Sequence, residues 1–406
     1  MRYDGIVIGG GPAGIMAAIT AAKDGQRVLL LERNDRLGKK LLITGKGRCN
    51  VTNDCSVEEV LQNVPRNGRF LYSALNAMPP ESVIDFFVER NCLLKTERGN
   101  RVFPVTDRSA TILDCLKAAL KDSEVTVLHE RVFEILASDG QVTGVSCGDR
   151  RYSSDWVILA TGGVSYPATG STGDGYKMAQ KFGHTVIAQE GSLVPLEADG
   201  CSDMQGLSLR NVAIKLVDAK GKLLFKDFGE LLFTHFGVSG PTVLSASAHL
   251  KGDNCKLYID LKPALDVAKL DARILRDLEQ YQNRTMENAL TDLLPRSIIP
   301  VVLRMVNIPS DLQANSLKKE QRRALLELMK AFPVSISGKR PVEEAIITSG
   351  GIKVSEIDPK TMESKIVRGL YFAGEIIDCD AYTGGFNLQI AWSTGFAAGT
   401  AVKNTN

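Results

Sequence analysis

The sequence of 406 residues lacks several features that define other classes of protein. No run approaches the roughly 18 apolar residues that a membrane-spanning helix requires. No long block of one charge sign occurs, and 49 basic residues stand against 47 acidic ones, so neither nucleic acid nor an anionic membrane is an expected partner. The eight cysteines include no CxxC pair, and no metal site is expected.

The N-terminus also lacks the pattern of a secretion signal. Met1-Arg2-Tyr3-Asp4 passes directly into an apolar strand, without the charged start, long apolar stretch and cleavage site of a signal peptide. Together with the scattered cysteines, this predicts a reduced, cytoplasmic protein. The chain shows no internal repeat, and its length and 44% hydrophobic content predict two or three domains.

The first 32 residues predict the opening of a nucleotide-binding sheet. A strand ends at Gly9, a helix begins at about Gly14, and a second strand ends at Glu32. The segment Gly9–Gly14 satisfies GxGxxG between strand and helix, so its backbone can approach a pyrophosphate at the helix N-terminus. Glu32 lies at the distance expected for an acid that accepts ribose hydroxyls. These signals together predict a dinucleotide site.

Two later segments favour FAD over NAD, because an NAD dehydrogenase has no reason to return to the same sheet near its C-terminus. Ala160-Thr161-Gly162-Gly163 ends one short apolar run and Tyr371-Phe372-Ala373-Gly374-Glu375 another. They resemble the strand ends ATG and GD of FAD-binding flavoproteins of the glutathione reductase structural class. The resemblance implies that Glu375, in place of Asp, binds the ribityl chain.

A closer resemblance extends over essentially the whole chain, to the BaiN-like and aminoacetone-oxidase-like flavoproteins. It is carried by residues 37–40 with 44–53, Gly170-Ser171-Thr172-Gly173-Asp174-Gly175, residues 232–241 and Tyr382-Thr383-Gly384-Gly385-Phe386-Asn387. One departure is Lys46, where glycine is common in the family. The resemblance implies either a reductase of activated carbon–carbon double bonds, as in bile-acid metabolism, or an amine oxidase that passes electrons to oxygen.

The loop of residues 38–53 and the glycines before the last helix are expected to run beside the cofactor. Lys39, Lys40 and Arg48 suit phosphate or the flavin edge, and a helix N-terminus beyond Gly385 favours negative charge on a reduced flavin. The expected residues for noncovalent FAD are Gly9, Gly11, Pro12, Ala13, Gly14, Glu32, Arg33, Lys40, Thr44, Gly45, Arg48, Cys49, Asn50, Val132, Ala160, Thr161, Gly162, Gly374, Glu375, Gly384, Gly385, Phe386, Asn387 and Leu388.

The candidate catalytic residues are His235, Arg48 and Tyr382. Histidine is the usual side chain for proton exchange at neutral pH, so His235 would serve as a general acid, or it orients a loop. Tyr382 would offer a hydroxyl to the flavin, or it packs in the core. Five residues separate Cys49 from Cys55 where disulfide reductases have four, so Cys49 is expected to pack near the cofactor rather than to relay electrons.

The predicted fold is α/β, with a three-layer Rossmann-type FAD-binding domain of residues 1–190 and 345–406. A β-barrel-like substrate domain of residues 191–262 and 333–344 and a helical insertion of residues 263–332 interrupt it. The predicted function is an FAD-dependent oxidoreductase that acts on a small organic substrate by hydride transfer at flavin N5, with NAD(P)H as a candidate transient reductant. The alternatives are an aminoacetone-like amine oxidase and a flavin-dependent factor that binds nucleic acid or protein. Binding to RNA would require a basic face on the folded protein.

Overall fold

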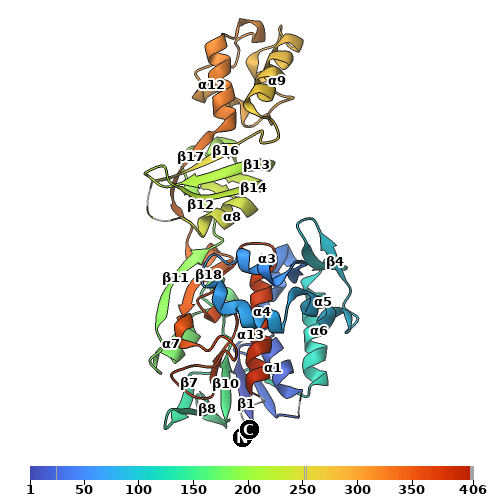
Figure 1. The fold of residues 1–406 in the computed structure, drawn as a ribbon, viewed down its shortest axis with the longest axis vertical. Coiled ribbons are helices and arrows are strands. Elements are labelled where there is room, and N and C mark those ends of the chain that lie inside the picture. Colours follow the sequence, from blue (N-terminus) through green and yellow to red (C-terminus); the bar gives the residue numbers. More distant parts are fainter. Residues whose placement is uncertain (24, 251, 253, 403–406) are drawn as a thin grey trace. The chain divides into compact units, whose positions relative to one another are not determined.

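The computed structural model of the protein describes residues 1–23, 25–250, 252 and 254–402. The chain forms two compact units, Met1–Ser192 together with Val342–Asn406, and Leu193–Pro341 (Figure 1). The first contains a parallel sheet covered by helices, and the second contains a closed barrel and a group of helices. The predicted α/β class, with a Rossmann-type domain, a barrel and a small helical part, is confirmed.

The parallel sheet of the first unit is built from segments far apart in the sequence. Its strands are β1 (Gly5–Ile8), β2 (Val28–Leu31), β6 (Thr126–Leu128), β10 (Trp156–Leu159) and β19 (Leu370–Phe372), in the order β19-β10-β1-β2-β6. All four pairings are parallel. The four strands other than β6 are fully buried, as continuous apolar runs in a two-sided parallel sheet must be. The C-terminal strand therefore does return to the N-terminal sheet.

Two helices from opposite ends of the chain lie side by side on one face of this sheet. Helix α1 (Pro12–Ala22) contacts α13 (Phe386–Ala401) along its length (Figure 1). A Cβ on Gly395 would lie 2.3 Å from the carbonyl oxygen of Ala13, and one on Gly399 would lie 2.6 Å from that of Ala17. The small residues of α13 thus allow close packing of helix against helix.

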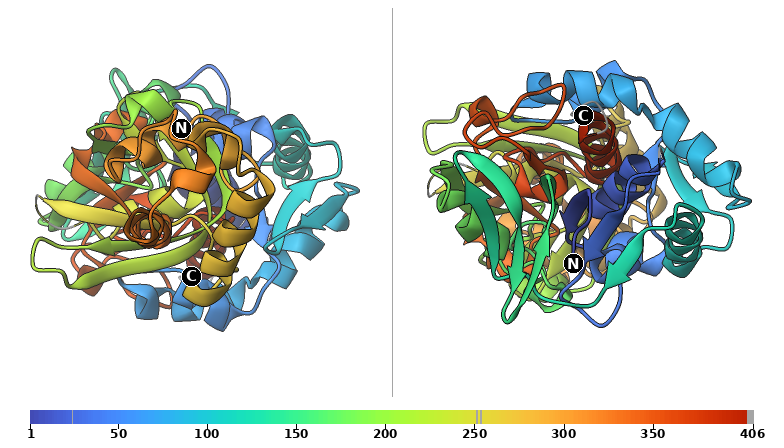
Figure 2. Two further views of the ribbon diagram at one scale, coloured as in Figure 1. Left: turned by 90° about the horizontal axis from the view of Figure 1, so that it is seen from above. Right: turned by 90° about the horizontal axis from the view of Figure 1, so that it is seen from below.

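The other face of the sheet carries an antiparallel meander, which completes the three layers (Figure 2). It consists of β7 (Glu134–Ser138), β8 (Gln141–Cys147) and β9 (Arg150–Ser153), and β8 contacts β10 and β1. The remaining elements of this unit are α2 (Lys39–Ile43), β3 (Thr52–Asn53), α3 (Val57–Gln62), α4 (Tyr72–Ala77), α5 (Pro80–Val88), β4 (Leu94–Glu97), β5 (Arg101–Pro104), α6 (Ser109–Asp122), α7 (Asp174–Gln180), β11 (Val186–Ser192) and β18 (Ile347–Ile352).

One buried histidine makes the stability of this unit sensitive to pH. The ring of His184 packs edge-on against Phe372 of β19, with 4.9 Å between ring centroids. Its Nε2 lies 2.8 Å from Ser364 Oγ and its Nδ1 lies 3.3 Å from a carboxylate oxygen of Glu356. Burial lowers the pKa of His184 below its ordinary value of 6.5, against the opposing effect of Glu356. The ring is therefore neutral in the folded protein near pH 7.

We expect the free energy of unfolding to fall as the pH drops through about 6.5, because the unfolded chain then binds a proton that folded His184 resists. The contribution of His184 is fully present above this pH and is lost progressively below it. In urea titrations, His184→Gln should show a shallower loss of stability on the acid side than the wild type. Equal slopes for the two proteins would show that His184 does not set this dependence.

The second unit is a six-stranded closed barrel with appended helices. Its strands are β12 (Leu196–Ala198), β13 (Ser208–Val217), β14 (Leu223–Thr234), β15 (Gly237–Ser239), β16 (Cys255–Asp260) and β17 (Phe332–Lys339), in the order β12-β15-β14-β13-β16-β17. Its helices are α8 (Pro241–Ser247), α9 (Val267–Gln280), α10 (Met286–Ala289), α11 (Ile299–Met305) and α12 (Lys319–Lys330). Barrel residues and helix residues such as Leu270 and Met329 belong to one apolar cluster, so the helices and the barrel share a core. Within the described residues, no helix combines the length and the apolar character needed to cross a membrane.

Candidate functional site

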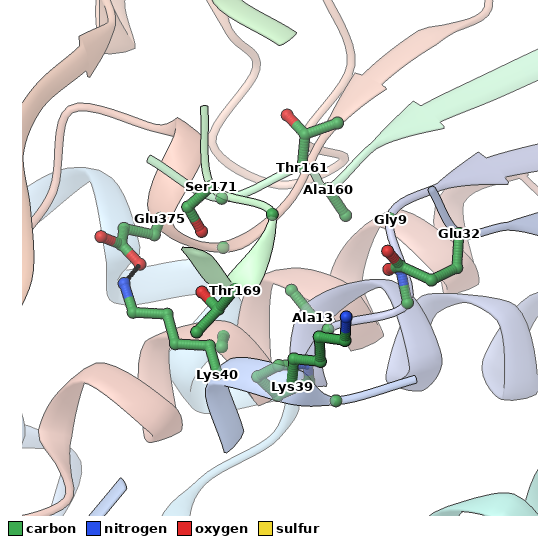
Figure 3. Close-up of a pocket in the computed structure, with 18 of the residues that line it drawn as sticks. Gly9, Ala13, Glu32, Lys39, Lys40, Ala160, Thr161, Thr169, Ser171 and Glu375 are labelled. Atoms are coloured by element: carbon green, nitrogen blue, oxygen red, sulfur yellow. Dashed lines mark hydrogen bonds and ion pairs between the residues drawn. The ribbon is translucent and has the colours of Figure 1, made fainter. Parts of the chain in front are cut away.

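A large cavity opens in the first unit at the carboxyl ends of β1, β2, β10 and β19, where α1 begins (Figure 3). Its empty volume, counted out to its open mouth, is about 1360 Å³. Pockets for small ligands usually measure about 300–1,000 Å³. The cavity is therefore large enough for a dinucleotide, and it lies where parallel sheets bind such ligands.

The glycine turn between β1 and α1 is shaped for close approach by a ligand. Gly9 has φ 109°, and a Cβ on it would lie 2.4 Å from the carbonyl oxygen of Ala160. A Cβ on Gly14 would lie 1.9 Å from the carbonyl oxygen of Gly9, so both glycines are required by the fold itself. At Gly11, in contrast, a Cβ would meet no described heavy atom within 4 Å. Gly11 precedes the first turn of α1, where N–H groups lack intrahelical partners and suit a pyrophosphate.

Glu32 at the end of β2 is held in one orientation by backbone donors. Its side chain is 7% exposed. One carboxylate oxygen accepts from the N–H of Gly10 at 2.7 Å, and the other accepts from the backbone and side-chain nitrogens of Asn34 at 2.8 and 2.7 Å. Asn34 occupies both acceptor positions of one oxygen, whereas the oxygen bonded to Gly10 keeps a second position open. The carboxylate is therefore preorganised to accept a hydroxyl of a ribose.

Charged residues beyond Glu32 form a network at the same end of the cavity. Arg33 donates to Thr172 Oγ1 at 2.6 Å and pairs with Asp174 at 3.1 Å. Arg131 pairs with the same carboxylate at 2.6 Å. This network ties the segment 170–174 to the end of β2.

A second network lies along the cavity wall at Glu375. Lys40 Nζ lies 2.5 Å from Glu375 Oε2 and 2.7 Å from Ser165 Oγ, and Figure 3 shows the Lys40–Glu375 pair. The other carboxylate oxygen accepts from Ser165 Oγ and from the N–H of Thr348, both at 2.8 Å. The side chains of Lys40 and Glu375 are 20% and 13% exposed. Glu375 is therefore a fixed, neutralised carboxylate and not a solvated surface acid.

The start of α13 is positioned by Asn387. Its side-chain oxygen accepts from the N–H of Ala381 at 2.9 Å, and its amide donates to the Ala381 carbonyl at 2.7 Å. Gly385 precedes the helix with φ 102°, and a Cβ there would lie 2.4 Å from the backbone of Thr52. The side chain of Asn387 thus fixes the loop that leads into the helix, and Asn387 and Leu388 line the cavity.

The structure brings most of the expected cofactor residues to this one cavity. Those that line it are Gly9, Gly11, Pro12, Ala13, Glu32, Arg33, Lys40, Thr44, Val132, Ala160, Thr161, Gly162, Gly374, Glu375, Asn387 and Leu388. Those that do not line it are Gly14, Gly45, Arg48, Cys49, Asn50, Gly384, Gly385 and Phe386. The latter group supports the turn, the loop and the helix start.

Further lining residues were not among the expected ones. They include Gly10, Asn34, Arg131, Thr169, Ser171, Thr172, Asp174, Ile347 and Cys379. Asn34 could have been predicted from the sequence, because it follows Glu32 by two residues. Residues 171–174 could also have been predicted, because they belong to a segment that carries the family resemblance. Ile347 and Cys379 reach the cavity only through the tertiary placement of β18 and of the loop before α13, which leaves no local pattern.

Arg48 is engaged away from the cavity. Its guanidinium hydrogen-bonds to Glu97 and Asp107 and lies over the ring of Phe103, 4.1 Å from the centroid. The hydrogen bond from Arg48 lowers the pKa of Glu97. Arg48 therefore anchors its loop to β4 and to the segment after β5. In the same loop Lys46 adopts φ 58°, a left-handed conformation that is strained for a lysine side chain.

The other two candidate catalytic residues also lie outside the lining. His235 is exposed and belongs to the second unit, between β14 and β15, where its ring contacts Phe236 edge-on at 5.0 Å. Tyr382 is half-buried, and its N–H donates to the carbonyl of Asn63 at 2.9 Å. Tyr382 is adjacent to Ala381, which Asn387 holds.

Cys49 and Cys55 are poorly suited to thiol chemistry. Cys49 is fully buried, and burial raises its pKa to about 12. Burial also raises the pKa of Cys55 to about 11, with Glu59 and Asp54 adding to the effect. Near pH 8 we expect about one thiolate in a thousand at Cys55, and the folded protein should resist alkylation by iodoacetamide at both positions. Mass spectrometry of native and urea-unfolded protein checks this, and rapid labelling of native Cys49 would contradict it.

Comparisons with known proteins identify the family of this chain. The family model for the HI0933-like protein Rossmann domain matches residues 3–401. A 3-dehydro-bile acid delta(4,6)-reductase of Clostridium scindens is 31% identical over 97% of this chain and 98% of its own length. A ribosomal RNA dihydrouridine synthase of Escherichia coli is 30% identical over 98% of this chain and 97% of its own length.

Solved structures show the same fold at low sequence identity. A 3-ketosteroid delta1-dehydrogenase from Sterolibacterium denitrificans superimposes with a TM-score of 0.53 at 14% identity, over 100% of both chains. A 3-ketosteroid-delta4-(5alpha)-dehydrogenase from Rhodococcus jostii RHA1 superimposes with a TM-score of 0.50 at 16% identity, over 100% of this chain and 97% of that one.

Proposed function

Because the chain belongs to the HI0933-like Rossmann family of FAD-binding oxidoreductases, we propose that it reduces a carbon–carbon double bond conjugated to a carbonyl group. The observation that carries this proposal is the dinucleotide cavity of the first unit, combined with two whole-length relatives whose names describe reductions of this kind. Steroid-like enones and the uracil ring of RNA share this reacting unit, although they differ greatly in size and charge. The proposal therefore specifies the reaction, and both steroid-like enones and uracil in RNA are candidate substrates.

The residues of the cavity fit FAD from one end to the other. Gly9, Gly11 and the N-terminus of α1 would hold the pyrophosphate, and Glu32 would hold the adenosine ribose. The pair Lys40–Glu375 would meet the ribityl chain or the flavin edge, and the start of α13 would meet the far end of the ring system. Bound FAD would supply hydride transfer at its N5 atom.

The chain itself must deliver a proton to the carbon next to the carbonyl, since the hydride adds to the other carbon of the double bond. We propose His235 or Tyr382 as the donor, on the residue types and the family resemblance. For Arg48 we propose a supporting role, because its contacts with Glu97, Asp107 and Phe103 hold the loop that follows α2. Asn387 keeps the segment of Tyr382 in place by its bonds to Ala381.

NAD(P)H is the proposed reductant, and an anaerobic titration tests both it and the reaction. Purified holoenzyme is mixed without air with NADPH, NADH or aminoacetone, and the flavin absorbance is followed. We expect bleaching by a reduced nicotinamide and recovery of the absorbance when a 3-keto-4-ene steroid or a uracil-containing oligonucleotide is added. Bleaching by aminoacetone, with recovery only in oxygen, would instead identify an amine oxidase and overturn the proposal.

A further inference from the structure

The outer face of the barrel in the second unit carries a row of basic and aromatic side chains. Lys215 of β13 lies directly opposite Lys226 of β14, and on its other side it lies opposite Tyr258 of β16. The neighbours of Lys215 in the strand, Ile214 and Leu216, are buried in the apolar cluster of this unit. Since side chains alternate along a strand, Lys215 and its two partners point outward.

The two lysines are unfavourable neighbours in the free protein. Like charges directly opposite each other on paired strands destabilise a sheet. No described carboxylate pairs with Lys215, Lys226 or Lys256, although each of the three is exposed. Asp227 follows Lys226 in β14 but lies opposite the buried Ile214, on the alternate face of the strand. On the outer face, Asp260 lies opposite Ala213 and is neutralised by Lys330 at 2.6 Å.

Protection of a sheet edge does not explain the lysines. Exposed lysines often blunt edge strands against aggregation, but β13 pairs on both sides, with β14 and β16, in a closed barrel. An anionic ligand that bridges Lys215 and Lys226 would relieve their repulsion.

Two aromatic side chains flank this basic row. Phe228 of β14 lies opposite Ala213, two residues along from Lys226, and is 53% exposed. Tyr258 is half-buried beside Lys215 on the other side. Exposed cations interleaved with aromatic rings on an open sheet are the arrangement that holds phosphates and stacks bases of a single-stranded nucleic acid.

The net charge of the whole chain does not reveal this basic face. Residues 193–341 contain 21 basic and 17 acidic residues, whereas the rest of the chain contains 28 basic and 30 acidic ones. The net charge of the whole sequence is close to zero because a basic unit and a slightly acidic unit offset each other. For this reason the net charge alone predicts no nucleic-acid partner.

We infer that the outer face formed by Lys215, Lys226, Lys256, Phe228 and Tyr258 binds single-stranded RNA. The lysines hold the phosphates and the two rings stack against bases. In naming RNA as the substrate class this inference rests on the proposed reductase function, with a uracil ring as the reducible group, but the binding itself is measurable without turnover.

The test is fluorescence anisotropy of a labelled oligouridylate with wild-type holoenzyme and with Lys215→Gln/Lys226→Gln. The matched control is Lys117→Gln/Lys121→Gln, which removes two exposed lysines from α6 in the first unit. We expect the barrel variant to bind about tenfold or more weakly and to lower the slope of log K against log salt by about 1.4, since each single-strand phosphate contact contributes about 0.7. The control should behave as the wild type.

The variant Phe228→Ala separates the contribution of base stacking to RNA binding from the contribution of charge. It should weaken binding by about fivefold or more, with an unchanged salt slope. Absence of wild-type binding at low salt, or equal losses in the barrel variant and the α6 control, would overturn the inference. The bleaching of the flavin by NAD(P)H, which requires no RNA, is followed on the same variants. Because none of these substitutions touches the FAD cavity, failure of RNA binding and failure of the reductase function are distinguished.

Discussion

Replacing Gly11 with valine is expected to leave the protein folded and to abolish FAD binding. The backbone at Gly11 is extended, with φ −85°, and a Cβ there meets no described heavy atom within 4 Å. The side chain would therefore begin in open space, on the side from which the pyrophosphate is expected to approach α1. Loss of a favourable N-cap residue costs about 1 kcal/mol at most, whereas FAD affinity should fall more than about 100-fold, or about 2.8 kcal/mol.

Gly14→Val is the matched control, in which FAD binding should be lost because the protein folds poorly. Its Cβ would lie 1.9 Å from the carbonyl oxygen of Gly9, so α1 and β1 must separate even without a ligand. We expect poor folding of this variant, with a lowered unfolding temperature of the FAD-free protein. Circular dichroism and calorimetric titration with FAD measure the two effects. Tight FAD binding by Gly11→Val would contradict the assignment of the glycine turn to the pyrophosphate.

Breaking the Lys40–Glu375 pair is expected to have the second largest effect. Among the described residues, Lys40→Met leaves the Glu375 carboxylate with Ser165 and the N–H of Thr348 as its hydrogen-bond partners. Because both side chains are mostly buried, the free energy of unfolding should fall by about 2 kcal/mol. FAD affinity should fall about tenfold, since both side chains line the cavity.

The double variant Lys40→Met/Glu375→Gln removes both charges and should recover part of this loss. A cycle of urea titrations on the wild type, the two single variants and the double variant gives the coupling free energy, for which we expect about 1 to 2 kcal/mol. Additive effects on both stability and FAD affinity would show that the two side chains act independently.

The sequence predicts the parts of the site that rest on local pattern. The turn Gly9–Gly14, Glu32 at a strand end and the glycine after β19 each follow a strand of continuous apolar residues, and the carboxyl ends of parallel strands meet at one edge of a sheet. Residues placed by this rule line the cavity. The closed barrel required pairing between β12, near residue 196, and β17, near residue 336, which no local pattern encodes.

The positions of charged side chains were less predictable. Arg48 has the residue type and the neighbouring glycines expected of a phosphate ligand, yet Glu97 of β4 and Asp107 after β5 hold it away from the cavity. The partner of a cation depends on tertiary contacts and not on spacing. The basic face of the barrel could not be predicted from the sequence either, because Lys215 and Lys226 become neighbours only through the pairing of β13 with β14.

The measurement that tests the central claim most directly is the flavin content of the purified protein, before and after incubation with FAD. The cavity described here predicts flavin absorbance bands and one noncovalently bound FAD per chain, released on denaturation. Absence of these bands from folded protein, even with excess FAD, would contradict the claim that this chain is an FAD-dependent oxidoreductase.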